Sequence, residues 1–108
     1  MIIATLRMTA PPGKQTDILH SLKPLLEPTR VQPGCLSCRL YRDVEQTHTF
    51  AWIEEWESQA ALERRFQSAD YRILLALLDL SSQPPEIRFD TVAATQGMEM
   101  IAAVTATR

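Results

Sequence analysis

The chain has 108 residues, of which 45% are hydrophobic and 22% are charged. This length suits one compact domain, and the composition is that of a soluble globular protein, which excludes a disordered chain. The 11 basic residues are balanced by 13 acidic ones, so no cationic surface indicates a nucleic-acid partner. No apolar run reaches the roughly 20 residues of a membrane-spanning helix, and the N-terminus lacks the basic leader of a signal peptide. We therefore expect a cytoplasmic protein that binds neither nucleic acid nor membrane.

The first half of the chain predicts a strand, a helix and a hairpin. Residues 2–9 are rich in β-forming side chains, and the Pro11-Pro12-Gly13 turn ends this strand. From residue 14 the apolar residues take a helical spacing, which predicts an amphipathic helix kinked at Pro24; they are Ile18, Leu19, Leu22, Leu25 and Leu26. Residues 35–43 and 47–57 are two strand-like runs that predict a hairpin.

The second half predicts two helices and a fourth strand. Ser58 and Ser68 are suitable N-caps for helices that follow them, and residues 71–80 are apolar almost all round. Residues 86–93 alternate again as a strand, whereas residues 98–104 fit either a strand or a short helix. The order β-α-β-β-α-β predicts an α+β, ferredoxin-like fold with an antiparallel four-stranded sheet and helices on one face.

Several segments, taken with their order and spacing, resemble the antibiotic biosynthesis monooxygenase family. They include PGCLSCRLYRD, EEWES followed by QAALERRF, SADYR and PPEIRFDTV. The resemblance covers roughly residues 1–93 and implies a dimeric α+β barrel, in which two ferredoxin-like sheets pack face to face. It leaves residues 94–108 as a C-terminal extension, which we expect at the dimer interface because residues 98–104 are apolar.

The resemblance also implies an activity. Characterised members of the family include cofactor-free quinol or anthrone monooxygenases and haem-degrading relatives. The positions that serve haem degradation correspond to Leu6, Phe66 and Ala76 here, and these residues do not suit iron. We therefore expect a homodimer without metal or other cofactor, which uses dioxygen to oxygenate a quinol, anthrone or polycyclic phenol. A non-catalytic ligand-binding dimer of the same fold, or a cofactor-free isomerase or decarboxylase, stays open as an alternative.

Such a reaction needs an apolar pocket for a ring, a proton acceptor and a polar group that holds the substrate anion. Glu54 ranks first as the base because it shares a strand face with two tryptophans, whose apolar surroundings favour a basic carboxylate. Asp70, where many relatives carry a histidine, and His20 are the other candidates. The expected substrate-binding side chains are Trp52, Trp56, Phe66, Tyr71, Arg72, Tyr41 and Arg39.

Each candidate also has a purely structural interpretation. The tryptophans can be core or dimer-interface residues, and Glu54 can form an ion pair with an arginine. The charged residues Glu63, Arg64 and Arg65 predict a solvated helix face. We further expect Trp and Phe side chains on the sheet face that the helices leave uncovered, where a second copy would bury them.

Cys35 and Cys38 form the Cys-x-x-Cys spacing of redox dithiols, but the surrounding sequence reads as a strand. Residues three apart on a regular strand point to opposite faces, which disfavours a disulfide. We therefore expect two small apolar core residues at these positions.

Overall fold

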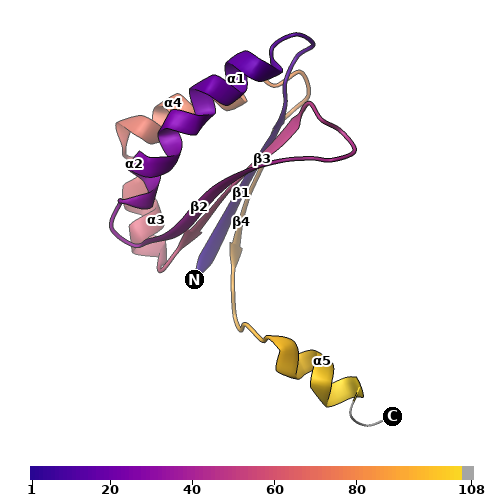
Figure 1. Ribbon diagram of the computed structural model, residues 1–108. Coiled ribbons are helices and arrows are strands. Elements are labelled where there is room, and N and C mark those ends of the chain that lie inside the picture. The colour runs from indigo at the N-terminus through magenta and orange to yellow at the C-terminus, as the bar shows by residue number, and fades with distance from the viewer. Residues whose placement is uncertain (106–108) are drawn as a thin grey trace.

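The computed structural model describes residues 1–105 and has four antiparallel strands in the order β2-β3-β1-β4. The strands are β1 (Ile2–Thr9), β2 (Cys35–Arg42), β3 (Thr49–Trp56) and β4 (Glu86–Thr91). The helices that follow β1 and β3 all cover the same face of the sheet (Figure 1). The predicted β-α-β-β-α-β fold is therefore confirmed. Within the described residues, no helix is long and apolar enough to cross a membrane.

The helical layer follows the sequence signals closely. The first helical segment is divided into α1 (Gln15–Leu22), a 3-10 turn at Lys23–Leu25 and α2 (Leu26–Arg30), because Pro24 occupies the start of the turn. The Ser58 hydroxyl accepts a hydrogen bond from the Ala61 amide and begins α3 (Gln59–Phe66). Ser68 caps α4 (Ala69–Leu78) in the same way.

The two tryptophans lie in the core between the sheet and the helices. β1 and β3 pair so that Leu6 stands beside Trp52 and Ala4 beside Glu54, and these positions face the helical layer. Trp52 and Trp56 are at most 2% exposed. Phe50 is buried in the same core, so the expectation that Trp and Phe side chains lie on the uncovered sheet face is wrong.

The uncovered face has a different composition. Register places Thr5 and Arg39 beside Ile53, and Tyr41 beside Ala51, on the side away from the helices. A shallow hollow on this face combines the apolar side chains of Ala51 and Ile53 with the hydroxyl of Thr5 and the charged groups of Arg7 and Arg88.

A β-bulge interrupts β2 near its start. Cys35 pairs with Trp56 and Ser37 pairs with Glu55, so Leu36 is an extra residue, and it is 55% exposed. Because of this bulge, Cys35 and Cys38 both lie on the helix-facing side, and the expectation that they point to opposite faces is wrong. Both thiols are free. Burial, with a contribution from the nearby Glu54 carboxylate, raises the pKa of Cys38 to about 12.

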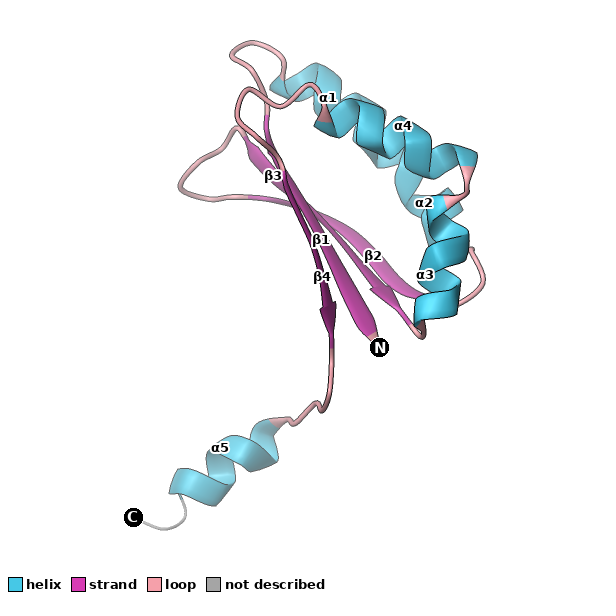
Figure 2. Ribbon diagram, turned by 180° about the vertical axis from the view of Figure 1, so that it is seen from behind, coloured by secondary structure: helices cyan, strands magenta, loops and turns pink. Residues whose placement is uncertain are grey.

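The C-terminal segment forms a helix, α5 (Met98–Thr105), which decides between the two structures that the sequence allowed. Figure 2 shows α5 standing away from the sheet and from the other helices. None of its residues is buried. The radius of gyration is accordingly 16.3 Å, against about 13 Å for a compact domain of this length.

Candidate functional site

The centre of the core holds a carboxylate that is enclosed by hydrogen-bond donors. Glu54 Oε2 accepts from Trp52 Nε1 at 2.7 Å and from Arg65 Nη2 at 2.9 Å. Oε1 accepts from Trp56 Nε1 at 2.8 Å and from Arg65 Nε at 3.4 Å. The side chains of Glu54 and Arg65 are 0% exposed. Each carboxylate oxygen thus has two donors, and the negative charge has a buried cation beside it.

This arrangement matches the ion-pair interpretation of Glu54. A substrate proton has no path to the carboxylate while the core is closed, since the side chain is fully enclosed. The role of Glu54 as a catalytic base therefore stays a prediction.

Arg65 is the residue that the sequence reading missed. It was expected on a solvated face, but it is fully buried and its Cζ atom lies 5.0 Å from the centre of the Tyr71 ring. Its position gives the signal: it follows Ala61 and Leu62 by four and three residues, so it shares their buried helix face. Tyr71 is buried beside this pair, and burial with the neighbouring Glu54 charge raises the pKa of Tyr71 to about 12.

The other candidate residues are spread over three surfaces. Asp70 is partly buried in the first turn of α4, whereas His20 and Arg72 are exposed on α1 and α4. Arg39 and Tyr41 lie on the uncovered sheet face, on the opposite side from Glu54. The structure therefore brings Trp52, Trp56, Tyr71 and Glu54 together. The other titratable candidates, which are Asp70, His20, Arg72 and Arg39, lie elsewhere.

Phe66 lies at a cleft that the sequence did not indicate, between α3 and β4. This aromatic cleft has a volume of about 380 Å³ and is lined by Ile2, Gln59, Leu62, Glu63, Phe66, Phe89 and Thr91. The Phe66 ring centre is 5.3 Å from that of Phe89 in an edge-to-face arrangement and 5.2 Å from that of Tyr71. Phe66 and Phe89 are 38% and 43% exposed, so their rings are open to a ligand. The size falls within the range of small-molecule sites.

The cleft exists because the helices do not extend over the edge strand. β4 residue Phe89 pairs with Ala4 of β1 and so faces the helical side, but every residue of β4 is exposed. Glu63 supplies the one carboxylate among the lining residues. An aromatic wall with a single acidic group at its rim suits a ring that carries a hydroxyl group.

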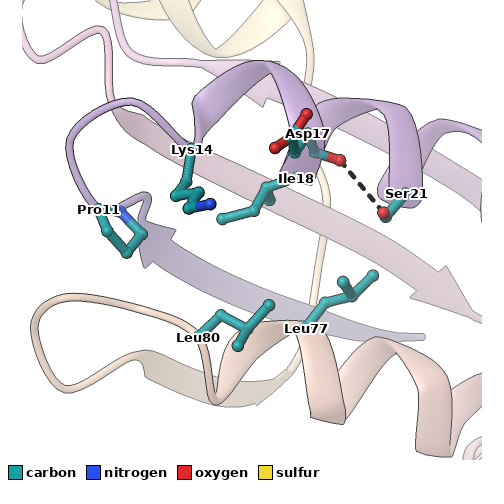
Figure 3. A pocket seen from close by; sticks show the side chains of 7 residues that line it. All are labelled: Pro11, Lys14, Asp17, Ile18, Ser21, Leu77 and Leu80. Atoms are coloured by element: carbon teal, nitrogen blue, oxygen red, sulfur yellow. Dashed lines mark hydrogen bonds between the residues drawn. The ribbon is translucent and has the colours of Figure 1, made fainter.

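A second hollow lies between α1 and α4 and has a volume of about 400 Å³ (Figure 3). Its walls are Pro11, Lys14, Asp17, Ile18, Ser21, Leu77 and Leu80. The Ser21 hydroxyl donates to the Asp17 carbonyl at 3.1 Å, so this hydroxyl is already hydrogen-bonded to the backbone of its own helix. The groove contains no aromatic ring and none of the candidate residues, so we favour the aromatic cleft as the functional site.

Between residues 1 and 105, no three His, Cys, Asp or Glu side chains are grouped in a way that could hold a metal ion. The absence of a cofactor stays a prediction.

Known proteins similar to this chain point to one family. The sequence matches the family described as "Antibiotic biosynthesis monooxygenase" over residues 1–74. An uncharacterised protein of Synechocystis sp. is 31% identical over 86 residues, which are 79% of this chain and 58% of that protein. The chain thus spans just over half the length of this curated relative.

Solved structures with the same fold are also known. A crystal structure described as an antibiotic biosynthesis monooxygenase has a TM-score of 0.77 at 24% identity and covers 87% of this chain and 100% of its own. A candidate monooxygenase of this kind from Deinococcus radiodurans has a TM-score of 0.80 at 19% identity, with 90% and 97% covered. A Pseudomonas aeruginosa protein is 28% identical with a TM-score of 0.74, covering 86% and 94%. The sequence match over residues 1–74 shows that this chain belongs to the antibiotic biosynthesis monooxygenase family.

Proposed function

We propose that this chain is a cofactor-independent monooxygenase that oxygenates a quinol, an anthrone or a similar polycyclic phenol in the aromatic cleft. The observation that carries the proposal is the half-exposed pair of Phe66 and Phe89, set edge to face beside the Glu63 carboxylate. Edge-to-face rings leave a flat surface on which a substrate ring can stack. Family membership supplies the class of reaction.

The proposed chemistry uses the substrate as its own electron source. The deprotonated phenol passes an electron to dioxygen, and the two radicals combine to a peroxide at a ring carbon. For an anthrone, the CH₂ group then becomes C=O with one oxygen atom from dioxygen, and the other oxygen leaves as water with the two hydrogens. The protein needs to bind the ring, exclude water and assist one proton transfer.

Glu63 is the carboxylate with access to a ring bound in the cleft, whereas Glu54 would need the core to open. An ordinary carboxylic acid and an ordinary phenol differ by about 6 pKa units, so such a carboxylate is a weak base for this task. We therefore expect turnover to rise with pH as more of the substrate ionises by itself.

We also propose that the protein is a homodimer. Support comes from the fold, which is typically dimeric in this family, and from the uncovered sheet face with Thr5, Tyr41 and Ile53 at its centre. Two such faces packed together would remove these side chains from water and produce the α+β barrel.

Oxygen uptake with a panel of anthrones and hydroquinones tests the function. Phe89→Ala should raise KM at least tenfold, because the substrate ring loses its stacking partner. Ile73→Ala is the matched control, since Ile73 is 50% exposed on α4 and does not line the cleft. Equal effects of the two variants would contradict the proposed site.

A ligand-binding protein without activity is the second candidate. The full enclosure of Glu54 by its four hydrogen bonds favours it, because the carboxylate that ranked first as the base is not accessible to a substrate while the core is closed. Calorimetry with the same compounds separates the two functions. Phe89-dependent binding without oxygen uptake would support the ligand-binding protein and overturn the monooxygenase.

A further inference from the structure

Helix α5 carries apolar side chains that nothing in its own domain buries. Its eight residues read MEMIAAVT, and Met98, Met100 and Ile101 are 74%, 61% and 61% exposed. A helix this short is marginal in water unless another surface packs against it. A cluster of exposed apolar side chains on one short helix is typical of an interaction segment.

A surface of matching character lies at the opposite edge of the sheet. A hollow of about 310 Å³, here called the β2 edge pocket, is lined by Arg30, Leu36, Ser37, Cys38 and Arg39. The bulge in β2 places Leu36 at its surface, 55% exposed, and Val31 at the end of α2 is 76% exposed. The pocket therefore combines the exposed Leu36 with two arginines, and Val31 follows its lining residue Arg30 in the sequence.

The charges of the two surfaces are complementary. Glu99 is the one charged residue of α5, and its carboxylate accepts a hydrogen bond from the Gly97 amide at 2.8 Å. Arg30 is already bonded to Glu27 and to the Cys38 carbonyl, whereas Arg39 is exposed at the pocket. An acidic first turn on α5 thus matches a pocket with an exposed arginine.

The register of the sheet places the two surfaces at the same end of the molecule. Thr91 at the end of β4 lies in one row with Ile2, Trp56 and Cys35 at the start of β2. The linker of residues 92–97 spans at most about 20 Å. In its own domain, the edge at β2 is three strand spacings away, about 14 Å. In a dimer with sheets packed face to face about an axis along the strands, the partner's β2 lies one sheet separation away, about 10 Å.

We propose that α5 packs into the β2 edge pocket of a second copy of this chain, and that the α5 of the second copy packs into the same pocket of the first. The inference rests on the proposed homodimer. Met100 and Ile101 cover Leu36 and Val31, and Glu99 approaches Arg39. The bulge at Leu36 is then the feature that prepares the pocket for this helix.

Disulfide trapping between two separately purified proteins tests the exchange. One protein carries Leu36→Cys and the other Ile101→Cys, both in a background with Cys35→Ala and Cys38→Ala, and one of them has a tag that changes its mass. After mixing and mild oxidation, we expect a covalent heterodimer at the summed mass. Val44→Cys replaces Leu36→Cys as the control, because Val44 is 92% exposed in the β2–β3 turn at the other end of the sheet.

Disulfide trapping and sedimentation together distinguish a wrong docking site from a wrong oligomeric state. If the mixture yields no heterodimer but a single chain with both cysteines closes on itself, α5 folds back onto its own domain and the exchange is overturned. If neither forms while sedimentation shows a dimer, the docking site is wrong and the homodimer stands. A monomer in sedimentation would overturn the homodimer itself. As a second variant with the native cysteines, Leu36→Asp should raise the dimer dissociation constant at least tenfold, whereas Val44→Asp should leave it unchanged.

Discussion

Glu54 accepts four hydrogen bonds from three side chains, so its replacement affects Trp52, Trp56 and Arg65 as well. Glu54→Gln would leave Arg65 as a buried cation without its counter-charge. We expect this change to lower the free energy of unfolding by about 3–5 kcal/mol, measured by urea denaturation. The double variant with Arg65→Met removes both charges and should lose less than the two single variants summed. A Glu54→Gln protein with the stability of the wild type would show that the ion pair contributes nothing.

Gly34 is needed for two separate reasons. Its φ is +85°, and a Cβ at this position would overlap the Cβ of Ala61 in α3. Gly34→Ala should therefore destabilise the fold by more than the roughly 1–2 kcal/mol that the backbone conformation alone costs. Gly13→Ala is the matched control, since Gly13 has a φ of +79° and open space around it. Equal thermal shifts for the two variants would mean that α3 moves aside without cost.

Two buried acids make the protein sensitive to alkali. The pKa of Cys38 and the pKa of Tyr71 are each raised to about 12 by burial, from 9.0 and 10.0. At a pH between the ordinary pKa and about 12, each group is deprotonated in the unfolded chain but still protonated in the folded one. The stabilising contribution of the two protonated groups is therefore complete below pH 9 and is lost as the pH rises toward 12. Urea midpoints measured from pH 8 to about pH 11 should fall, and the fall should be shallower in Tyr71→Phe. A slope unaffected by Tyr71→Phe would mean that this hydroxyl does not contribute.

At the scale of the elements, the pattern of apolar residues was sufficient for most of the fold. The strand at 2–9 has the predicted bounds, and Ser58 and Ser68 begin helices as predicted, because these features depend on local sequence. The bulge at Leu36 shifts the alternation of β2 by one residue, so that Cys35 is followed on the helix-facing side by Cys38 and Leu40, and this break is too short to stand out in an eight-residue strand. As a result, Cys35 and Cys38 lie on the same face of the sheet and not on opposite faces.

The candidate site was harder to predict than the fold. The sequence correctly placed Trp52, Glu54 and Trp56 on one face of β3, but periodicity does not say which side of the sheet that face meets. Charge led Arg65 to be assigned to solvent, although its spacing from Leu62 assigned it to the core. The aromatic cleft depends on where α3 stops relative to β4, which is a property of tertiary packing and not of either segment.

For the whole molecule, the C-terminal segment provides the sharpest prediction. Removing residues 94–108 should weaken the dimer at least tenfold in sedimentation equilibrium, since α5 would no longer contact the second copy. The core should keep its fold, because no residue of α5 is buried in it. A truncated protein with the dimer affinity and melting temperature of the full chain would contradict this prediction.

The hydrogen bonds of Trp52 and Trp56 have a practical consequence for spectroscopy. The sequence contains two tryptophans, and both indole N–H groups donate to the same buried carboxylate. The tryptophan fluorescence of the protein therefore comes from one small region that is buried in the core. A shift of its emission toward that of hydrated indole would report the opening of this region, and not the motion of a surface loop.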